Sequence, residues 1–136
     1  MTELIVLKIG GSVLTYKGKR ARENKQAIAR IAREIASAKK RTGARLIIVH
    51  GAGSFGHAMV AKHKLNEGVY SKKQFTAVAE THLMISELSN LFCKQLISNG
   101  VPAVSFPPIA LAESSEKKLE KIFLKNIREF LDRGIV

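Results

Sequence analysis

Two glycine-rich segments carry the residue types that bind phosphate groups. The first is Lys8-Ile9-Gly10-Gly11-Ser12, with Thr15 and Lys17 just beyond it, and the second is His50-Gly51-Ala52-Gly53-Ser54-Phe55-Gly56-His57. Glycines let backbone N–H groups approach an anion closely, and a helix that begins in such a loop adds the positive end of its dipole. The lysines and the histidine add charge and hydrogen-bond donors. The two segments together predict two adjacent phosphate sites.

Each glycine-rich segment follows a predicted strand. Leu4 to Ile9 and Leu46 to Val49 are short apolar runs with β-branched residues, as in buried strands. Between them, Asn24 can cap a helix that runs to about Arg41, and Gly43 ends it. A strand–helix–strand order predicts parallel strands, whose carboxyl ends lie at one edge of the sheet, where ligands bind in open α/β folds.

The rest of the sequence predicts further elements of an α/β sheet. We expect a short helix at about 55–63, a polar loop at 64–71, a long helix at about 73–98 and a third strand at 101–106. Segment 109–124 is ambiguous, with a short strand or hairpin piece near 119–123, and a helix follows at 126–133. The expected fold class is α/β, a three-layer α/β/α sandwich with a mostly parallel sheet that is cut off in mid-sheet.

Two common nucleotide-binding motifs do not fit. Gly51, Gly53 and Gly56 match G-x-G-x-x-G, but the dinucleotide-binding motif follows the first strand and has an acidic residue about 20 residues later. Here it follows the second strand, and Tyr70-Ser71-Lys72-Lys73 stands at that distance. No G-x-x-x-x-G-K-[ST] occurs. The sequence therefore argues against a nicotinamide or flavin enzyme and against a P-loop NTPase.

The charge balance favours anionic small molecules as partners. The 136 residues include 23 Lys and Arg against 11 Asp and Glu, a formal net charge of +12, but the basic runs are short and lack interleaved aromatics, which argues against nucleic acid. No apolar run approaches the roughly 18 residues of a membrane helix and no secretory signal is visible, so we expect a cytoplasmic location and no membrane contact.

Two scarce residue types complete the composition. Asp132 is the only aspartate, and no carboxylate near the glycine segments suits a metal, so no metal ligand is assigned. Cys93 is the only cysteine, and in its apolar helical pattern we expect a buried, unreactive thiol.

These segments resemble those of a known enzyme family. Val6-Leu7-Lys8-Ile9-Gly10-Gly11-Ser12 is similar to the opening of the amino acid kinase superfamily. Residues 50–57 closely resemble the HGGGSFGH signature of isopentenyl phosphate kinases, except that Ala52 replaces a frequent glycine, so either its φ is negative or the loop is slightly altered. The resemblance implies an amino acid kinase-like fold and ATP-dependent phosphorylation of isopentenyl phosphate to isopentenyl diphosphate, with ATP and Mg²⁺ as cofactors.

The resemblance also implies roles for individual residues. Lys8, Lys17 and His57 would be catalytic, because the lysines would stabilise the transferring phosphoryl group and His57 would hold the acceptor phosphate. The ATP phosphates would face Lys8, Gly10, Gly11 and Ser12. The acceptor phosphate and its isoprenoid tail would be bound by this set: Ala52, Gly53, Ser54, Gly56, His57, Tyr70, Phe75, Val78 and Ile85.

Some of these residues have a purely structural alternative. Phe75, Val78 and Ile85 lie at helical spacing and could equally belong to the core. His50 favours a structural role at a strand end, bonded to the backbone, and we interpret His63 and His82 as non-catalytic.

Members of the family are about twice as long as this chain, and their second half supplies the adenine site and an aspartate that orients the two lysines. We therefore expect residues 1–136 to be the N-terminal, acceptor-binding part of an amino acid kinase domain, with its ATP-binding part absent. The expected partners are isopentenyl phosphate, ATP, and a complementary C-terminal half or a second copy in a homodimer. Two other functions stay open: another phosphotransferase of the superfamily, such as a phosphonate (fosfomycin-type) kinase, and a non-catalytic anion-binding fragment.

Overall fold

A computed structural model describes residues 3–18 and 21–136. Strands β1 (Leu4–Ile9) and β2 (Arg45–His50) form a parallel pair, in register from Leu4 opposite Arg45 to Ile9 opposite His50. Helix α2 (Lys25–Thr42) connects them. The Asn24 side chain caps α2 by accepting a hydrogen bond from Ala27 N, and Gly43 ends it in the left-handed conformation. The predicted strand–helix–strand unit is confirmed together with both caps.

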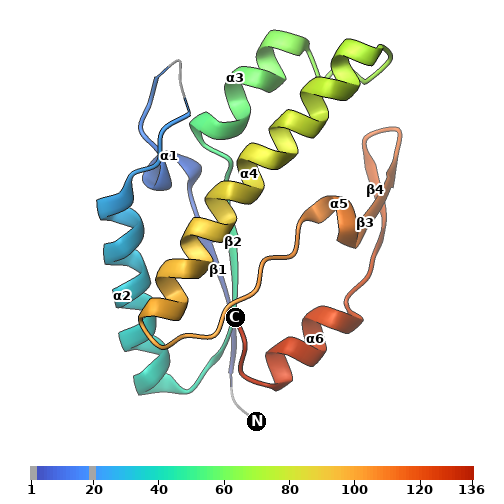
Figure 1. Ribbon diagram of the computed structural model, residues 1–136. Helices are drawn as coiled ribbons and strands as arrows, with labels where there is room; N and C mark the ends of the chain where they lie inside the picture. Colours follow the sequence, from blue (N-terminus) through green and yellow to red (C-terminus); the bar gives the residue numbers. More distant parts are fainter. Residues whose placement is uncertain (1–2, 19–20) are drawn as a thin grey trace.

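Three more helices pack around this unit (Figure 1). They are the short α1 (Gly11–Leu14), α3 (Ser54–His63) and the long α4 (Lys72–Ser98). Ser71 and Gln74 form a capping box at the start of α4, which satisfies two backbone amides that a helix start leaves without partners. The predicted bounds of α3 and α4 are therefore correct to within one residue.

The core lies between one face of the sheet and helices α2 and α4. Ile28 of α2 and Leu88 and Leu96 of α4 are almost fully buried against Ile9 and Leu46 of the strands. Because side chains alternate across a strand, the residues next to Ile9 and Leu46 point to the opposite face. Because the two strands are parallel and share this core face, both glycine loops begin at the same edge of the sheet.

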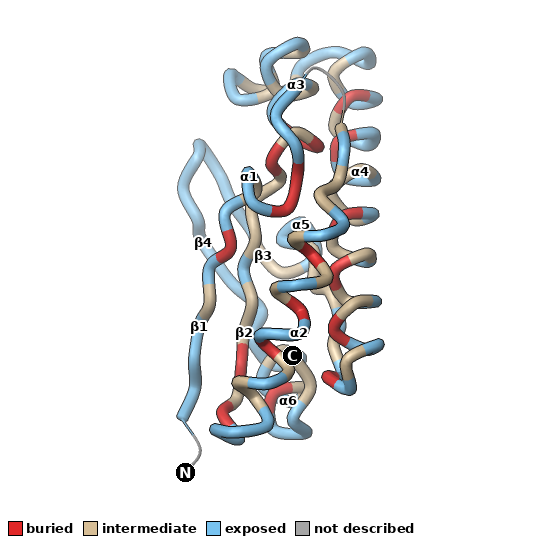
Figure 2. Tube along the Cα trace, turned by 90° about the vertical axis from the view of Figure 1, so that its left-hand side faces the viewer, coloured by how far each residue is buried: buried red, intermediate tan, exposed pale blue. Residues whose placement is uncertain are grey.

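The opposite face of the sheet is open in the described residues. Val6 is 63% exposed, Val49 50% and Leu4 44%, and β1 runs along the outside of the molecule in Figure 2. Within residues 3–18 and 21–136, helices α2 and α4 cover the core face of the parallel sheet, and the last helix, residues 125–132, contacts β2. The α/β class is confirmed.

The C-terminal third contains a hairpin and a helix. Helix α5 (Pro108–Leu111) leads into the antiparallel strands β3 (Ala112–Ser115) and β4 (Lys118–Ile122), and α6 (Lys125–Asp132) follows. The last helix and a hairpin piece near 119–123 are as predicted, whereas α5 and β3 lie in the part of 109–124 that the sequence left ambiguous. The hairpin is exposed except at Ala112, which is half-buried.

The prediction of a third strand at 101–106 is wrong. This segment forms no strand. Val101 N donates to Leu96 O at the end of α4, and the other backbone bonds join it to the last residue of the chain: Val104 N donates to Val136 O, and Val136 N donates to Pro102 O, both at 2.9 Å. Pro102 has no N–H to donate, and one partner residue cannot form a continuous ladder. The apolar pattern was that of a strand, but within the described residues no neighbouring strand completes it.

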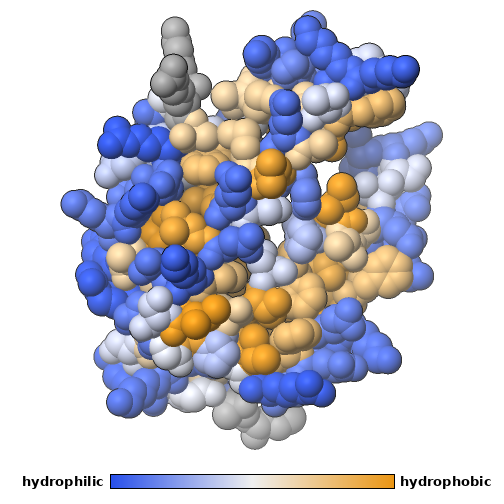
Figure 3. All heavy atoms as spheres, in the orientation of Figure 1, coloured by the Kyte–Doolittle hydropathy of each residue, from blue (hydrophilic) through white to orange (hydrophobic). Residues whose placement is uncertain are grey.

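Hydrophobic atoms gather in the middle of the face that carries α4, and hydrophilic atoms surround them (Figure 3). Exposed apolar side chains on this helix include Phe75, Leu83 and Ile97. None of the helices in the described ranges is long and apolar enough to cross a membrane.

Candidate active site

The two glycine loops lie directly against each other at the carboxyl ends of β1 and β2. A Cβ on Gly11 would stand 2.7 Å from Gly53 Cα, and a Cβ on Gly51 would stand 2.9 Å from Gly11 N. Carbon atoms in proteins do not approach backbone this closely, so a side chain at either position would push the loops apart. Gly53 also has φ 53° and ψ −137°, a backbone conformation that side chains disfavour. The predicted adjacency of the two segments is confirmed.

Thr15 joins the two loops. Its side chain is buried, its hydroxyl donates to Gly11 O at 2.9 Å, and the same oxygen accepts from Ser54 N at 3.0 Å. Sequence reasoning gave this threonine no role, because nothing local marks it: its partners are four residues before it and 39 residues after it.

Several backbone amides around this junction stay open. In residues 3–18 and 21–136, no acceptor takes the N–H of six residues of the two loops and helix starts: Gly10, Gly11, Ser12, Ala52, Gly53 and Gly56. The first amides of a helix have no partner inside it, and α1 and α3 both begin here. Open amides on two loops in contact can bind the oxygens of an anion, and the helix starts add positive potential.

The three predicted catalytic side chains surround the junction and face solvent. Lys8 is the second-last residue of β1, paired with Val49 on the face opposite the core. Lys17 lies on the loop that leaves α1, and His57 lies in the first turn of α3. Each side chain is exposed, so a phosphate at the junction could reach its donors without displacing packed residues.

The residues predicted to cradle the acceptor phosphate differ in the groups that they leave available to a ligand. Ser54 N is taken by Thr15, and Ser54 Oγ accepts from Arg22 N at 3.4 Å, so its hydroxyl hydrogen is what it can offer a ligand. Gly56 is buried, and a Cβ there would meet Ala52 Cβ at 2.7 Å and Ile85 Cδ1 at 3.4 Å. The distance to Ile85 on α4 is an ordinary contact, so the missing side chain matters mainly for Ala52, which lies close to the first turn of α3. The amide of Gly56 stays open.

Ala52 keeps an ordinary backbone conformation. It is absent from the residues with positive φ in the described chain, so a methyl group fits without strain. Of the two explanations that the sequence left open for this position, the negative φ is confirmed.

His50 has a structural role, as expected. Its Nδ1 lies 3.1 Å from Gly51 O and its Nε2 2.9 Å from Ser89 Oγ, while Ser89 Oγ donates to Ile85 O at 3.0 Å. The imidazole thus ties the end of β2 to α4. Sequence reasoning missed Ser89; the available signal was a serine on the apolar face of a long helix.

The four residues assigned to the isoprenoid tail do not share a pocket. Tyr70 is 83% exposed and Phe75 57%, whereas Val78 and Ile85 are half-buried. A pocket of about 320 Å³ at the far end of α3 includes Tyr70 but none of the other three. Their joint role as a tail site stays a prediction.

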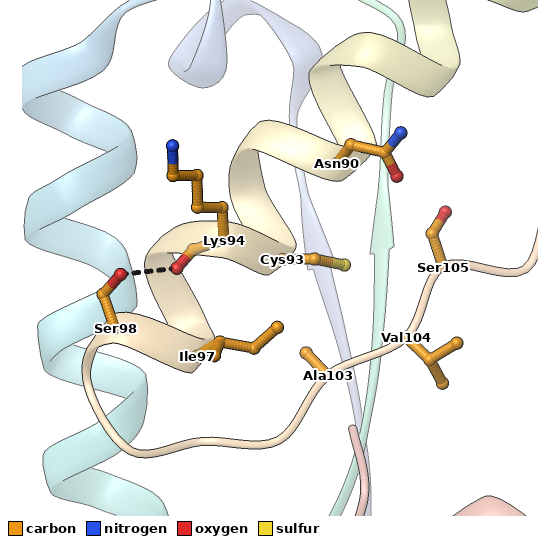
Figure 4. A pocket seen from close by; sticks show the side chains of 8 residues that line it. All are labelled: Asn90, Cys93, Lys94, Ile97, Ser98, Ala103, Val104 and Ser105. Atoms are coloured by element: carbon orange, nitrogen blue, oxygen red, sulfur yellow. Dashed lines mark hydrogen bonds between the residues drawn. The ribbon is translucent and has the colours of Figure 1, made fainter.

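The larger pocket lies away from the glycine loops. It has a volume of about 490 Å³ and lies between the C-terminal half of α4 and residues 103–105, with Cys93 and Ile97 on its helical wall (Figure 4). Ser98 Oγ, at its edge, donates to Lys94 O at 2.8 Å. Burial raises the pKa of the Cys93 thiol above its ordinary value.

The carboxylates present do not fit a Mg²⁺ site at the junction. In the described ranges no group of three or more His, Cys, Asp or Glu side chains could hold a metal. Asp132 pairs with Arg45 at 3.1 Å. Glu23, whose backbone forms an isolated β-bridge with that of Thr15, pairs with Lys25 at 3.4 Å. A hydrogen bond from its own backbone is the main cause that lowers the pKa of Glu23. Mg²⁺ needs several oxygen ligands in a regular arrangement, which these residues do not offer.

The whole described chain matches one family model. Residues 3–136 match the model of the amino acid kinase family. The chain belongs to the amino acid kinase family. This membership accounts for the parallel strands that end in glycine loops, and it confirms the fold that the first segment implied.

The most informative relatives are isopentenyl phosphate kinases. The chain is 33% identical to the isopentenyl phosphate kinase of Methanothermobacter thermautotrophicus and 31% identical to that of Methanocaldococcus jannaschii, over 98% of its own length in each case. It covers 51% and 53% of those proteins, so it spans about half their length.

Solved structures give the same picture. An X-ray structure of an isopentenyl phosphate kinase superposes with a TM-score of 0.87 at 30% identity, covering 98% of this chain and 56% of that one. The product complex of the T. acidophilum isopentenyl phosphate kinase superposes with a TM-score of 0.78 at 25% identity, over 99% of this chain and 53% of that one.

Proposed function

We propose that this chain binds isopentenyl phosphate and supplies the acceptor side of its ATP-dependent phosphorylation to isopentenyl diphosphate. The observation that carries the proposal is the junction of the two glycine loops, with six open amides and with Lys8 and His57 beside it. The similarity to isopentenyl phosphate kinases over 98% of the chain supports isopentenyl phosphate as the acceptor among phosphorylated small molecules.

The reaction needs positioning and charge neutralisation from the protein. The bond between the γ-phosphorus of ATP and its bridging oxygen breaks, an oxygen of the acceptor phosphate forms the new bond to phosphorus, and ADP leaves. Two anions must therefore approach each other, and the protein has to offset their repulsion. In our proposal the loop after β1, with Lys8, Lys17, Gly10, Gly11 and Ser12, faces the transferring group. The loop after β2 holds the acceptor phosphate.

His57 is the side chain proposed to hold the acceptor phosphate directly. Its imidazole can donate a charge-assisted hydrogen bond, which is about twice as strong as a neutral one. Lys8 is exposed at the strand end, and its ammonium group sits on a flexible four-carbon stem, so it can follow the transferring phosphoryl group. Mg²⁺, which kinases use to bridge and neutralise phosphates, would have to draw its protein ligands from outside the described residues.

Calorimetric titration of the 136-residue chain tests the proposal. We expect isopentenyl phosphate to bind and isopentenol, which lacks the phosphate, not to bind. His57→Ala should weaken isopentenyl phosphate about 10- to 100-fold, the effect of removing a hydrogen bond to a charged group. His82→Ala is the matched control, because His82 is also exposed but belongs to α4 and to neither glycine loop. The affinity of this variant should equal that of the unmodified chain.

Three results would count against parts of this proposal. Absence of binding by a folded chain would remove the proposed function. Inorganic phosphate binding as tightly as isopentenyl phosphate would favour a general anion site. Equal effects of the two histidine variants would remove the role of His57.

A further inference from the structure

Thr15 holds groups from both glycine loops with one hydroxyl. It is 3% exposed, and Thr81 is the only other polar side chain that is buried in the described residues. The Thr15 hydroxyl donates to Gly11 O and accepts from Ser54 N, which leaves no hydrogen on it for any ligand. A buried hydroxyl whose bonds are all internal acts on the positions of its partners.

Helix α3 depends on Thr15 because it has no cap of its own. Gly53 occupies the N-cap position and makes no side-chain bond to the helix. A helix start normally finds an oxygen from its own N-cap side chain, usually serine, threonine, aspartate or asparagine. Here the oxygen comes from a different element, at the end of α1, and it takes the first amide of α3.

The same contact decides which amides remain open for a ligand. Phe55 N donates to Ala52 O at 3.1 Å and His57 N to Gly53 O at 3.4 Å. With Ser54 N bound to Thr15, the amides still open in this loop and helix start are those of Ala52, Gly53 and Gly56. Because Thr15 also bonds Gly11 O, the open amides of the two loops are held in one arrangement.

We propose that Thr15 is a positioning residue that sets the placement of the two phosphate-binding loops relative to each other. A phosphate bound by one loop then finds the other loop in place, and less of the binding free energy is spent on ordering them. The identity of the ligand in this inference rests on the proposed function. The Thr15 link, its bonds to Gly11 O and Ser54 N, is present without ligand and can be measured in the free chain.

Amide hydrogen exchange by NMR, without ligand, tests the link in the 136-residue chain. In Thr15→Val, which keeps the shape and loses the hydroxyl, Ser54 N–H should exchange at least about ten times faster, because it loses its acceptor. Thr15→Ser keeps the hydroxyl and should restore the slow exchange. Thr81→Val is the matched control, since it removes the other buried threonine hydroxyl, whose bond at 2.7 Å stays within its own helix at Ala77 O.

Titration with isopentenyl phosphate adds the functional readout. We expect Thr15→Val to weaken binding about fivefold, the effect of losing a helix cap, with Thr15→Ser and Thr81→Val close to the unmodified chain. Unchanged Ser54 exchange in Thr15→Val would overturn the inference. So would equal losses of affinity in Thr15→Val and Thr81→Val.

The outcomes separate this inference from the proposed function. If the unmodified chain does not bind isopentenyl phosphate but Ser54 exchange responds as expected, the proposed function fails and the Thr15 link is supported. If Thr15→Val does not fold, the unmodified chain decides: Ser54 N–H exchanging as fast as the open amide of Gly56 would overturn the link, and slower exchange supports it.

Discussion

At the scale of single residues, burial determines which reactive groups are available. Cys93 lines the larger pocket but is half-buried, and burial raises the pKa of its thiol because the charged thiolate is poorly solvated there. The lysines and the histidine beside the glycine loops are exposed instead. The sequence predicted a buried, unreactive thiol: Cys93 is only half-buried, and its low reactivity stays a prediction.

Cys93 should react slowly with iodoacetamide in the native chain. Its raised pKa keeps the thiol protonated, and the thiolate is the nucleophile, so alkylation at pH 9 should be at least severalfold slower than in the urea-unfolded chain. The same shift implies that its contribution to stability is complete below the ordinary pKa of 9.0 and is lost as pH rises through the raised value. Equal alkylation rates in the two states would contradict both statements.

At the scale of elements, the fit between the loop before α3 and the first turn of that helix depends on a glycine and an alanine. A Cβ on Gly56 would lie 2.7 Å from Ala52 Cβ and 3.4 Å from Ile85 Cδ1. We expect Gly56→Ala to destabilise the chain by about 1–2 kcal/mol, because overpacking exceeds the gain of about 1 kcal/mol in helix propensity.

A second substitution makes the test specific to this contact. Ala52→Gly removes the methyl group that the new Cβ would meet, so the double variant should regain most of the stability lost in Gly56→Ala. Urea unfolding of the single and double variants measures this coupling. A Gly56→Ala chain more stable than the unmodified chain would show that helix propensity dominates and that Ala52 can move aside.

Local signals in the sequence predicted most elements. The prediction of a strand at 101–106 failed because that segment has no neighbouring strand in the described residues. The strand at 4–9 and the helix at 25–42 have their own patterns and caps, so they could be located from sequence. Residues 101–106 have the composition of a strand, but a strand also needs a partner, and composition does not report one.

The glycines and basic side chains of the candidate site could be predicted, because their types and spacing are visible in the sequence. The two loops and their adjacency followed from strand order alone. Thr15 and Ser89 were not found, because their partners come from distant elements that only the fold brings together. The tail residues were inferred from helical spacing, which cannot distinguish a pocket from a core.

At the scale of the whole molecule, the described fold is unusually open. Its accessible surface is 9636 Å², whereas a compact monomer of 14.9 kDa would expose about 7,000 Å². The exposed side chains of the open sheet face and of α4 contribute to this excess, among them Val6, Val49 and Leu83.

This openness should lower the cooperativity of urea unfolding. The slope of unfolding free energy against urea scales with the surface newly exposed, so we expect about four-fifths of the slope of a compact domain of equal length. The measurement is urea unfolding followed by circular dichroism at two protein concentrations. A full-sized slope, or a midpoint that rises with concentration, would mean that another chain covers this surface in solution.

The mutual contact of the glycine loops also limits how such a site can be redesigned. A side chain introduced at Gly11 collides with Gly53, and one at Gly53 collides with the Thr15 hydroxyl. Single substitutions here are therefore poor starting points for a combinatorial library that seeks new acceptors. A library should first vary the side chains around the junction, or substitute residues of both loops in the same variant. The reason is that each loop restricts the side chains that the other can accept.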